Sequence, residues 1–194
     1  MIRINTENLE EGLMVTGRNP NTRQAELIRL GVGSFTNHNA MVVKPNDEWG
    51  IAEAVPPYSK VTSIEDYERL MNEENYLVRF YRLKTLTYQQ NKNAADYFVN
   101  YLLNLPYPRK SRMILLALPL FNAFVDKVGW MPSMRLNWCS QLVMAAFLSE
   151  SADCLDGVNG KKKLMFTPKT FENRIMFGLF EDVTDKILVK QETA

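Results

Sequence analysis

The sequence predicts an α+β domain in which an antiparallel sheet packs against helices, and three observations lead to this prediction. Of its 194 residues, 46% are hydrophobic and 23% are charged, which is close to the globular average. No internal repeat, low-complexity tract or Pro/Gly/Ser-rich linker divides the chain, so residues 1–194 are expected to form one domain. Short β-type runs alternate with segments of helical periodicity.

In the first half of the chain, turn and cap signals delimit each element. Gly31 ends a periodic apolar segment, as glycine does beyond a helix C-terminus. Pro45-Asn46-Asp47 separates two runs rich in Val, Ile, Trp and Ala, which predicts a β-hairpin. Ser63 with acidic residues after it predicts a capped helix. The expected elements are a helix over 22–30, strands over 39–44 and 49–55, a helix from 63 to about 71 and a strand over 77–83.

The second half is predicted to be mainly helical. Thr87 with Gln90 matches a capping box, and Thr167-Pro168 combines a cap residue with proline at the first helical position. The expected elements are helices over 87–103, 112–128, 138–147 and 167–173, a loop over 151–163 and a strand over 186–190. The helix over 138–147 places Cys139 in its first turn.

Charge and cysteine content exclude several classes of protein. The 23 basic and 22 acidic residues leave a net charge of +1, which gives no domain-wide reason to bind nucleic acid. The longest apolar stretch, Met113–Phe121, is shorter than the ~20 residues that a membrane span needs, so no integral membrane segment is expected. No secretory signal is visible at the N-terminus, which predicts a cytoplasmic protein. Two cysteines do not form a disulfide framework for a domain of this size.

His38 is the only histidine, and the predicted hairpin brings it near Glu53. If residue 40 pairs with 53 and residue 42 with 51, His38 and Glu53 lie on one face as diagonal neighbours, with Cα atoms roughly 7–8 Å apart. A register shifted by one residue would put them on opposite faces. The alternatives are a structural histidine and a solvent-facing glutamate on an edge strand.

Cys139 is the third candidate. A first helical turn lowers the pKa of a thiol because the helix N-terminus favours negative charge, and a nearby imidazolium lowers it further. The alternative is a small buried hydrophobe on an amphipathic helix. One histidine with two widely spaced cysteines is a poor zinc set, so no metal site is predicted.

Five segments together resemble the circularly permuted NlpC/P60 (papain-like) cysteine hydrolases of the YiiX type. They are Gly12-Leu13-Met14-Val15, Asn37-His38-Asn39-Ala40-Met41-Val42-Val43, Ile51-Ala52-Glu53-Ala54, Val78-Arg79-Phe80-Tyr81-Arg82-Leu83 and Trp138-Cys139-Ser140-Gln141-Leu142-Val143. The resemblance spans about residues 12 to 172, and the histidine and its acid precede the cysteine. It implies the circularly permuted papain-like fold.

The resemblance also implies a function. Cys139 would be the nucleophile, His38 the general base and acid, and Glu53 the residue that orients the imidazole, with no cofactor. Tyr107 resembles a tyrosine upstream of the nucleophile in this family, and Trp138 stands where tyrosine is frequent, so the resemblance implies that both lie at the substrate or oxyanion site.

The expected reaction is cleavage of an amide, in a peptide or an acylated amine, through a thiol acyl-enzyme. The same fold could instead carry an acyltransferase, an ester or thioester hydrolase, or a ligand-binding module without turnover. Gln141 replaces the glutamate that often follows Cys-Ser in the family. The segment 108–135 matches no family motif, and its position before Cys139 suggests that it shapes the substrate cleft.

Overall fold

A computed structural model describes residues 1–18, 26, 30, 33–107, 138–155 and 167–191 of the chain. The expected helix over 112–128 and the segment 108–135 lie outside the described residues, as does the loop over 151–163 beyond residue 155. Of the helix expected over 22–30, only Glu26 and Leu30 are described, and both are helical.

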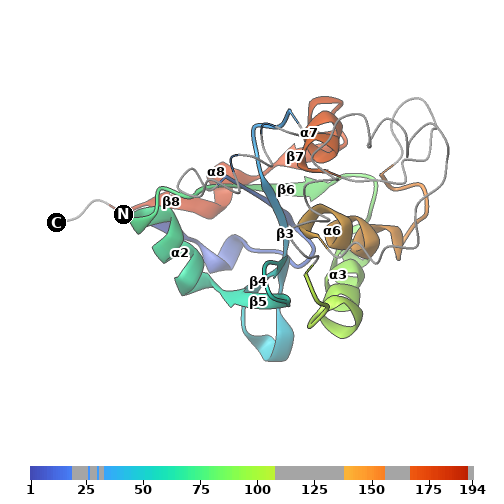
Figure 1. The fold of residues 1–194 in the computed structure, drawn as a ribbon, viewed down its shortest axis with the longest axis horizontal. Coiled ribbons are helices and arrows are strands. Elements are labelled where there is room, and N and C mark those ends of the chain that lie inside the picture. The colour runs from blue at the N-terminus through green and yellow to red at the C-terminus, as the bar shows by residue number, and fades with distance from the viewer. Residues whose placement is uncertain (19–25, 27–29, 31–32, 108–137, 156–166, 192–194) are drawn as a thin grey trace.

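The centre of the molecule is a six-stranded antiparallel sheet (Figure 1). In spatial order its strands are β5 (Ser59–Ser63), β4 (Gly50–Ala54), β3 (His38–Val43), β2 (Met14–Arg18), β6 (Leu77–Leu83) and β7 (Phe180–Asp182). A second, two-stranded sheet joins β1 (Ile2–Ile4) to β8 (Leu188–Lys190), so the two ends of the described chain pair with each other.

Helices cover both faces of the large sheet. They are α2 (Ile64–Glu73), α3 (Tyr88–Tyr97) continued by the π-helical turn η3 (Phe98–Leu102), α6 (Cys139–Leu148), α7 (Pro168–Met176) and α8 (Thr184–Ile187). Figure 1 shows α2 on one side of the sheet and α3 and α6 on the other. Each face has its own apolar cluster, one that includes Tyr67 of α2 with Phe80 and one that includes Phe147 of α6 with Met41.

The β3–β4 hairpin has the register predicted from the sequence. Ala40 pairs with Glu53 and Val42 pairs with Ile51. The connection is a tight turn, η2 (Pro45–Asp47), in which Asn46 adopts a φ of 53°. Asparagine tolerates this left-handed conformation better than most residues do. The turn therefore fixes the register that places alternate side chains on known faces.

Three predicted helix starts are confirmed, each by a side chain that satisfies a backbone N–H of the first turn. The hydroxyl of Ser63 accepts from Asp66 N–H at the start of α2. Reciprocal capping boxes begin α3 at Thr87 and α7 at Thr167. Cys139 is the first residue of α6, after Trp138 in an extended conformation, so its predicted place in a first helical turn is also confirmed.

The strand expected over 186–190 is wrong in its first half. The helix α8 occupies Thr184–Ile187, and only Leu188–Lys190 form β8. Ile187 is buried in the cluster beneath α2, and a single helical turn carries the chain there before β8 pairs with β1. The edge strand β5 was not predicted, because its sequence Ser-Lys-Val-Thr-Ser has one apolar residue. Within the described part, no helix is both long and apolar enough to cross a bilayer.

Candidate active site

His38 and Glu53 form a hydrogen-bonded ion pair. His38 is the first residue of β3, two positions before Ala40, and Ala40 pairs directly with Glu53 of β4. The distance between His38 Nε2 and Glu53 Oε2 is 2.7 Å, and both side chains are at least 85% buried. The diagonal placement expected from the hairpin therefore brings the imidazole and the carboxylate together, and the second ring nitrogen, Nδ1, stays available to another partner.

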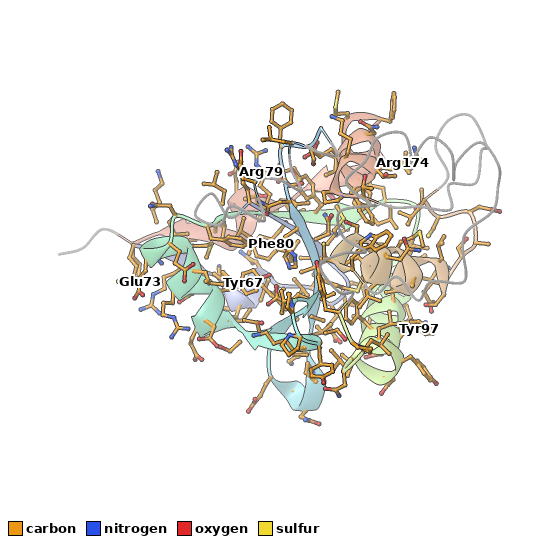
Figure 2. The ribbon with its side chains drawn as sticks, viewed as in Figure 1. Tyr67, Glu73, Arg79, Phe80, Tyr97 and Arg174 are labelled. Carbon is orange, nitrogen blue, oxygen red and sulfur yellow. The ribbon has the colours of Figure 1, made fainter. Side chains whose placement is uncertain are left out.

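Glu53 is held by two further donors. Thr62 Oγ1 of β5 donates to Glu53 Oε1 at 2.5 Å, and Tyr67 Oη of α2 donates to Glu53 Oε2 at 3.1 Å. Tyr67 projects from α2 toward the sheet (Figure 2). With donors on both oxygens, the carboxylate cannot rotate without breaking hydrogen bonds. Glu53 is thus a buried anion whose orientation is fixed by three separate elements, and it is not a solvent-facing charge.

Cys139 begins α6, which packs on the opposite face of the sheet, and its thiol lies at the start of β3. The charge of His38 lowers the pKa of this thiol, which places the imidazole within electrostatic range of the sulfur, and Ser140 Oγ lies 3.8 Å from the sulfur. Ser140 anchors this end of the helix, because its Oγ donates to Asn39 Oδ1 at 2.9 Å. Cys139 is only 6% exposed. The helix start therefore holds the sulfur against the strand that carries the imidazole.

The electrostatics of the three groups favour a charged pair. Burial raises the pKa of the Cys139 thiol, but the charge and hydrogen bond of His38, with hydrogen bonds from Asn39 and Ser140, bring it below its ordinary value. Burial lowers the pKa of His38, yet the charge and hydrogen bond of Cys139, followed by the hydrogen bond and charge of Glu53, raise it from 6.5 to about 10. Both shifts favour the charged pair, a thiolate beside an imidazolium, over the neutral pair.

Glu53 completes this charge arrangement. Burial raises the pKa of its carboxyl group, but the hydrogen bond and charge of His38, with hydrogen bonds from Thr62 and Tyr67, lower it below 4.5 overall. The pKa of Tyr67 is raised well above its usual value by burial and by the charge of Glu53, so this phenol stays protonated and donates. The carboxylate therefore remains an anion that stabilises a protonated His38.

A glycine beside His38 leaves room for an aromatic side chain. Gly17 of β2 pairs directly with His38, and a Cβ built on it would lie 2.1 Å from Tyr76 Oη. Any larger residue at position 17 would therefore displace Tyr76. Burial, then the charges of Glu53 and Cys139, raises the pKa of Tyr76 well above its usual value. Tyr76 is thus a neutral wall of the pocket around the imidazole.

The remaining sequence candidates are Tyr107 and Trp138. Burial and the negative charge of Cys139 raise the pKa of Tyr107, which places this partly buried phenol within electrostatic range of the sulfur. Trp138 is 6% exposed and directly precedes α6. Cys154 is buried, and its thiol donates to the Phe147 carbonyl oxygen at 3.3 Å.

Several site residues were not identified from the sequence. They are Gly17, Asn39, Thr62, Tyr67 and Tyr76. The alternation of β3 puts Asn39 on the opposite face from His38, which was a usable signal, since an asparagine in a buried strand position needs a partner. No signal in the sequence pairs Thr62 or Tyr67 with Glu53, because both contacts depend on how β5 and α2 return to the sheet.

Among the residues that the structure describes, no group of three or more His, Cys, Asp or Glu side chains is placed to hold a metal ion. Glu53 is instead hydrogen-bonded to His38, and the charge of His38 acts on the nearby thiol of Cys139. This arrangement suits the activation of a thiol as a nucleophile and the transfer of a proton.

No family model and no curated protein sequence matches the chain. Among solved structures, the fold is similar to a crystal structure described as the metalloprotein yiiX from Escherichia coli O157:H7, with a TM-score of 0.50 and 15% sequence identity. The similarity covers 90% of this chain and 96% of that one. The resemblance to YiiX-type proteins thus has structural support, whereas the link to NlpC/P60 rests on sequence motifs alone. The chain has a mixed α+β, papain-like fold in which antiparallel strands pack against helices.

Proposed function

We propose that the protein is a cysteine hydrolase that cleaves an amide, in a peptide or a small acylated amine, through an acyl-enzyme on Cys139. The observation that carries this proposal is the series of Glu53, His38 and Cys139, in which the carboxylate is hydrogen-bonded to the imidazole at 2.7 Å and the imidazole and the thiol shift each other's pKa toward the charged pair. A buried thiolate next to an imidazolium is a strong nucleophile with a proton donor already in place. The papain-like fold is consistent with this chemistry.

In the first step, the Cys139 thiolate attacks the carbonyl carbon of the amide and forms a C–S bond. The C–N bond then breaks as His38 gives its proton to the leaving nitrogen, which departs as a neutral amine. The acyl group remains on sulfur as a thioester, and His38 is now neutral. Glu53 holds the ring by accepting from Nε2, so the proton that moves is the one on Nδ1.

In the second step, water attacks the thioester carbonyl carbon while neutral His38 accepts one of its protons. The C–S bond breaks, the carboxylic acid leaves, and the thiolate and imidazolium are restored. The charge of Glu53 favours the imidazolium in both steps, because the carboxylate is buried and close to the ring.

The negative oxygen of each tetrahedral intermediate needs hydrogen-bond donors. The Cys139 backbone N–H is one candidate, because the hydrogen bonds within α6 begin with the N–H groups of Gln141 and Leu142 donating to Trp138. Asn39 offers the second. Its Oδ1 accepts from Ser140, whereas its Nδ2 is buried without a hydrogen-bond partner. A buried donor without a partner beside the nucleophile is available to an incoming oxyanion.

The test uses p-nitrophenyl acetate, which acylates activated thiols. The wild-type protein is expected to release a burst of p-nitrophenol equal to the enzyme concentration and to carry one acetyl group on Cys139 by peptide mass spectrometry. Cys139→Ala is expected to lose the burst, whereas Cys154→Ala, which removes the other buried thiol, keeps it. A burst that survives in Cys139→Ala would overturn the assignment of the nucleophile.

A screen of amide, ester and thioester substrates then identifies the preferred bond. Adding a primary amine separates hydrolysis from acyl transfer, since a transferase gives the new amide in place of the acid. A protein that forms no acyl-enzyme with any of these substrates, although it is folded, is a binding module and not an enzyme.

A further inference from the structure

A cavity of about 620 Å³ lies at the end of the sheet where β2 finishes and β6 begins, near the pair Arg18 and Leu77. Its walls come mainly from β2, β6, α7 and the loop before β3, with single residues of β1, α2 and β8, and most of the lining residues are apolar. The apolar side chains include Phe35, Leu77 and Met176, which are 74%, 61% and 79% exposed and form the rim. The volume lies in the usual range for small-molecule sites, roughly 300–1,000 Å³.

The charged side chains that line the cavity differ in whether they have a partner of opposite charge. The guanidinium of Arg18 makes no hydrogen bond or ion pair with any described residue, and its Nε is buried. Arg79 lies 3.5 Å from Asp182 in an ion pair. Glu172 Oε1 accepts from the Ser34 hydroxyl at 2.6 Å and from the Thr36 N–H at 2.7 Å. Its Oε2 is buried without a hydrogen-bond partner, but the carboxylate charge is paired with the Lys169 ammonium at 3.6 Å. The one unmatched charge among the described lining residues is therefore the cation of Arg18.

The cavity adjoins the candidate active site on both faces of β2. Thr16 lines it and pairs directly with Asn39, whose side chain bonds to Ser140 next to the nucleophile. Residues that pair directly across two strands project on the same face of a sheet, so Thr16 lies on the face of Asn39, which is the face that α6 covers. Arg18 is two residues after Thr16 in β2, so its side chain projects on the same face. On the other face, Tyr76 lines the cavity and packs over Gly17, the partner of His38.

We propose that this cavity binds the apolar, carboxylate-bearing part of the substrate, with Arg18 as the residue that recognises the carboxylate. That the bound molecule is a substrate of Cys139 rests on the proposed function, whereas the binding of a carboxylate by Arg18 does not depend on that function. A guanidinium presents several N–H donors in a plane and matches a carboxylate through two parallel hydrogen bonds. The apolar lining takes the hydrocarbon part of the same molecule.

A partly buried cation without a partner is costly in the free protein, so an anion that enters gains more there than at an exposed arginine. An uncharged analogue of the same shape would leave Arg18 unmatched while gaining the same apolar contacts. The site should therefore discriminate by charge far more than by hydrocarbon shape.

The binding test uses 4-phenylbutyrate and its uncharged amide, 4-phenylbutanamide, measured by isothermal titration calorimetry. Wild-type protein should bind the acid at least about 10-fold more tightly than the amide. Arg18→Gln should weaken binding of the acid at least about 10-fold and leave the amide unchanged, and Arg18→Lys, which keeps the charge without the planar fork, should retain part of the affinity. Arg69→Gln removes an exposed arginine of α2 as the matched control and should change neither ligand. Equal binding of acid and amide, or an Arg18→Gln variant that binds the acid normally, would overturn the proposal.

A second measurement tests whether the cavity serves the nucleophile. Saturating 4-phenylbutyrate should slow alkylation of Cys139 by iodoacetamide at least about fivefold in the wild type and have no effect in Arg18→Gln. Binding that depends on Arg18 without protection of Cys139 would overturn the assignment of the cavity to the substrate. Failure of the acetylation burst together with intact binding at Arg18 would instead refute the proposed function alone, so the two failures are distinguishable.

Discussion

The thiolate of Cys139 should depend on His38 in a way that pH can reveal. His38→Ala removes the imidazolium that lowers the pKa of the thiol and leaves burial, the largest of the influences, which raises it against the smaller lowering by Asn39 and Ser140. For a thiol with the ordinary pKa of 9.0, the thiolate fraction falls roughly 90-fold between pH 8 and pH 6. In His38→Ala the rate of alkylation by iodoacetamide should fall by at least that factor, and in the wild type by less than about tenfold.

The assay follows alkylation of Cys139 by peptide mass spectrometry at the two pH values. Because Cys139 is 6% exposed, absolute rates depend on access of the reagent, but access cancels in the ratio of two rates for the same variant. Parallel losses in wild type and His38→Ala would refute the thiolate–imidazolium pair. Any hydrolysis should also decline above about pH 10, where His38 loses the proton that the leaving group needs.

Three further substitutions test the surroundings of this pair. Glu53→Gln should lower kcat/KM at least about 10-fold. Because the pKa of Glu53 is lower in the folded protein than 4.5, the carboxylate stabilises the fold above that pH, and this stabilisation is lost as the pH falls. The decrease in the free energy of unfolding at acid pH, measured by urea denaturation, should therefore be absent in Glu53→Gln. Gly17→Ala should lower the free energy of unfolding by about 1–3 kcal/mol, because the added methyl group displaces Tyr76. Adding Tyr76→Phe, which removes the hydroxyl nearest to that methyl group, should recover part of the loss. Unchanged stability in Gly17→Ala would contradict the close contact. Asn39→Ala should lower kcat about 100-fold, whereas Ser140→Ala, which removes the same hydrogen bond but keeps the amide, should stay within a few-fold of wild type; equal losses would exclude Asn39 as an oxyanion donor.

The hairpin shows how far local signals predict this fold. Pro45-Asn46-Asp47 marks the turn, and the turn determines which residues of the two strands face each other. From that register alone, His38 and Glu53 fall on one face, and their hydrogen bond at 2.7 Å agrees with it. The capped starts of α2, α3 and α7 were predictable for the same reason, since a cap needs only residues three positions apart.

Contacts between distant segments were not predictable in this way. The hydrogen bonds from Thr62 and Tyr67 to Glu53 depend on the position of β5 at the sheet edge and on the direction in which α2 leaves it. The strand expected over 186–190 was half wrong because Ile187 is buried by a helical turn, and tertiary packing overrides the local β propensity there. The cavity at Arg18 likewise forms between β2, β6 and α7, which no local pattern connects.

The distance along the chain between the two halves of the candidate site has a consequence for biosynthesis. Asn39 and Ser140, whose side chains join β3 to α6, are 101 residues apart, and His38 and Cys139 precede them directly. A nascent chain emerging from the ribosome exposes His38 long before Cys139 is made, and until the two segments dock the sulfur is an ordinary, weakly nucleophilic thiol. Maturation of the reactive group is therefore coupled to completion of tertiary structure, so misfolded or unfinished chains carry no activated sulfur to react with neighbouring molecules.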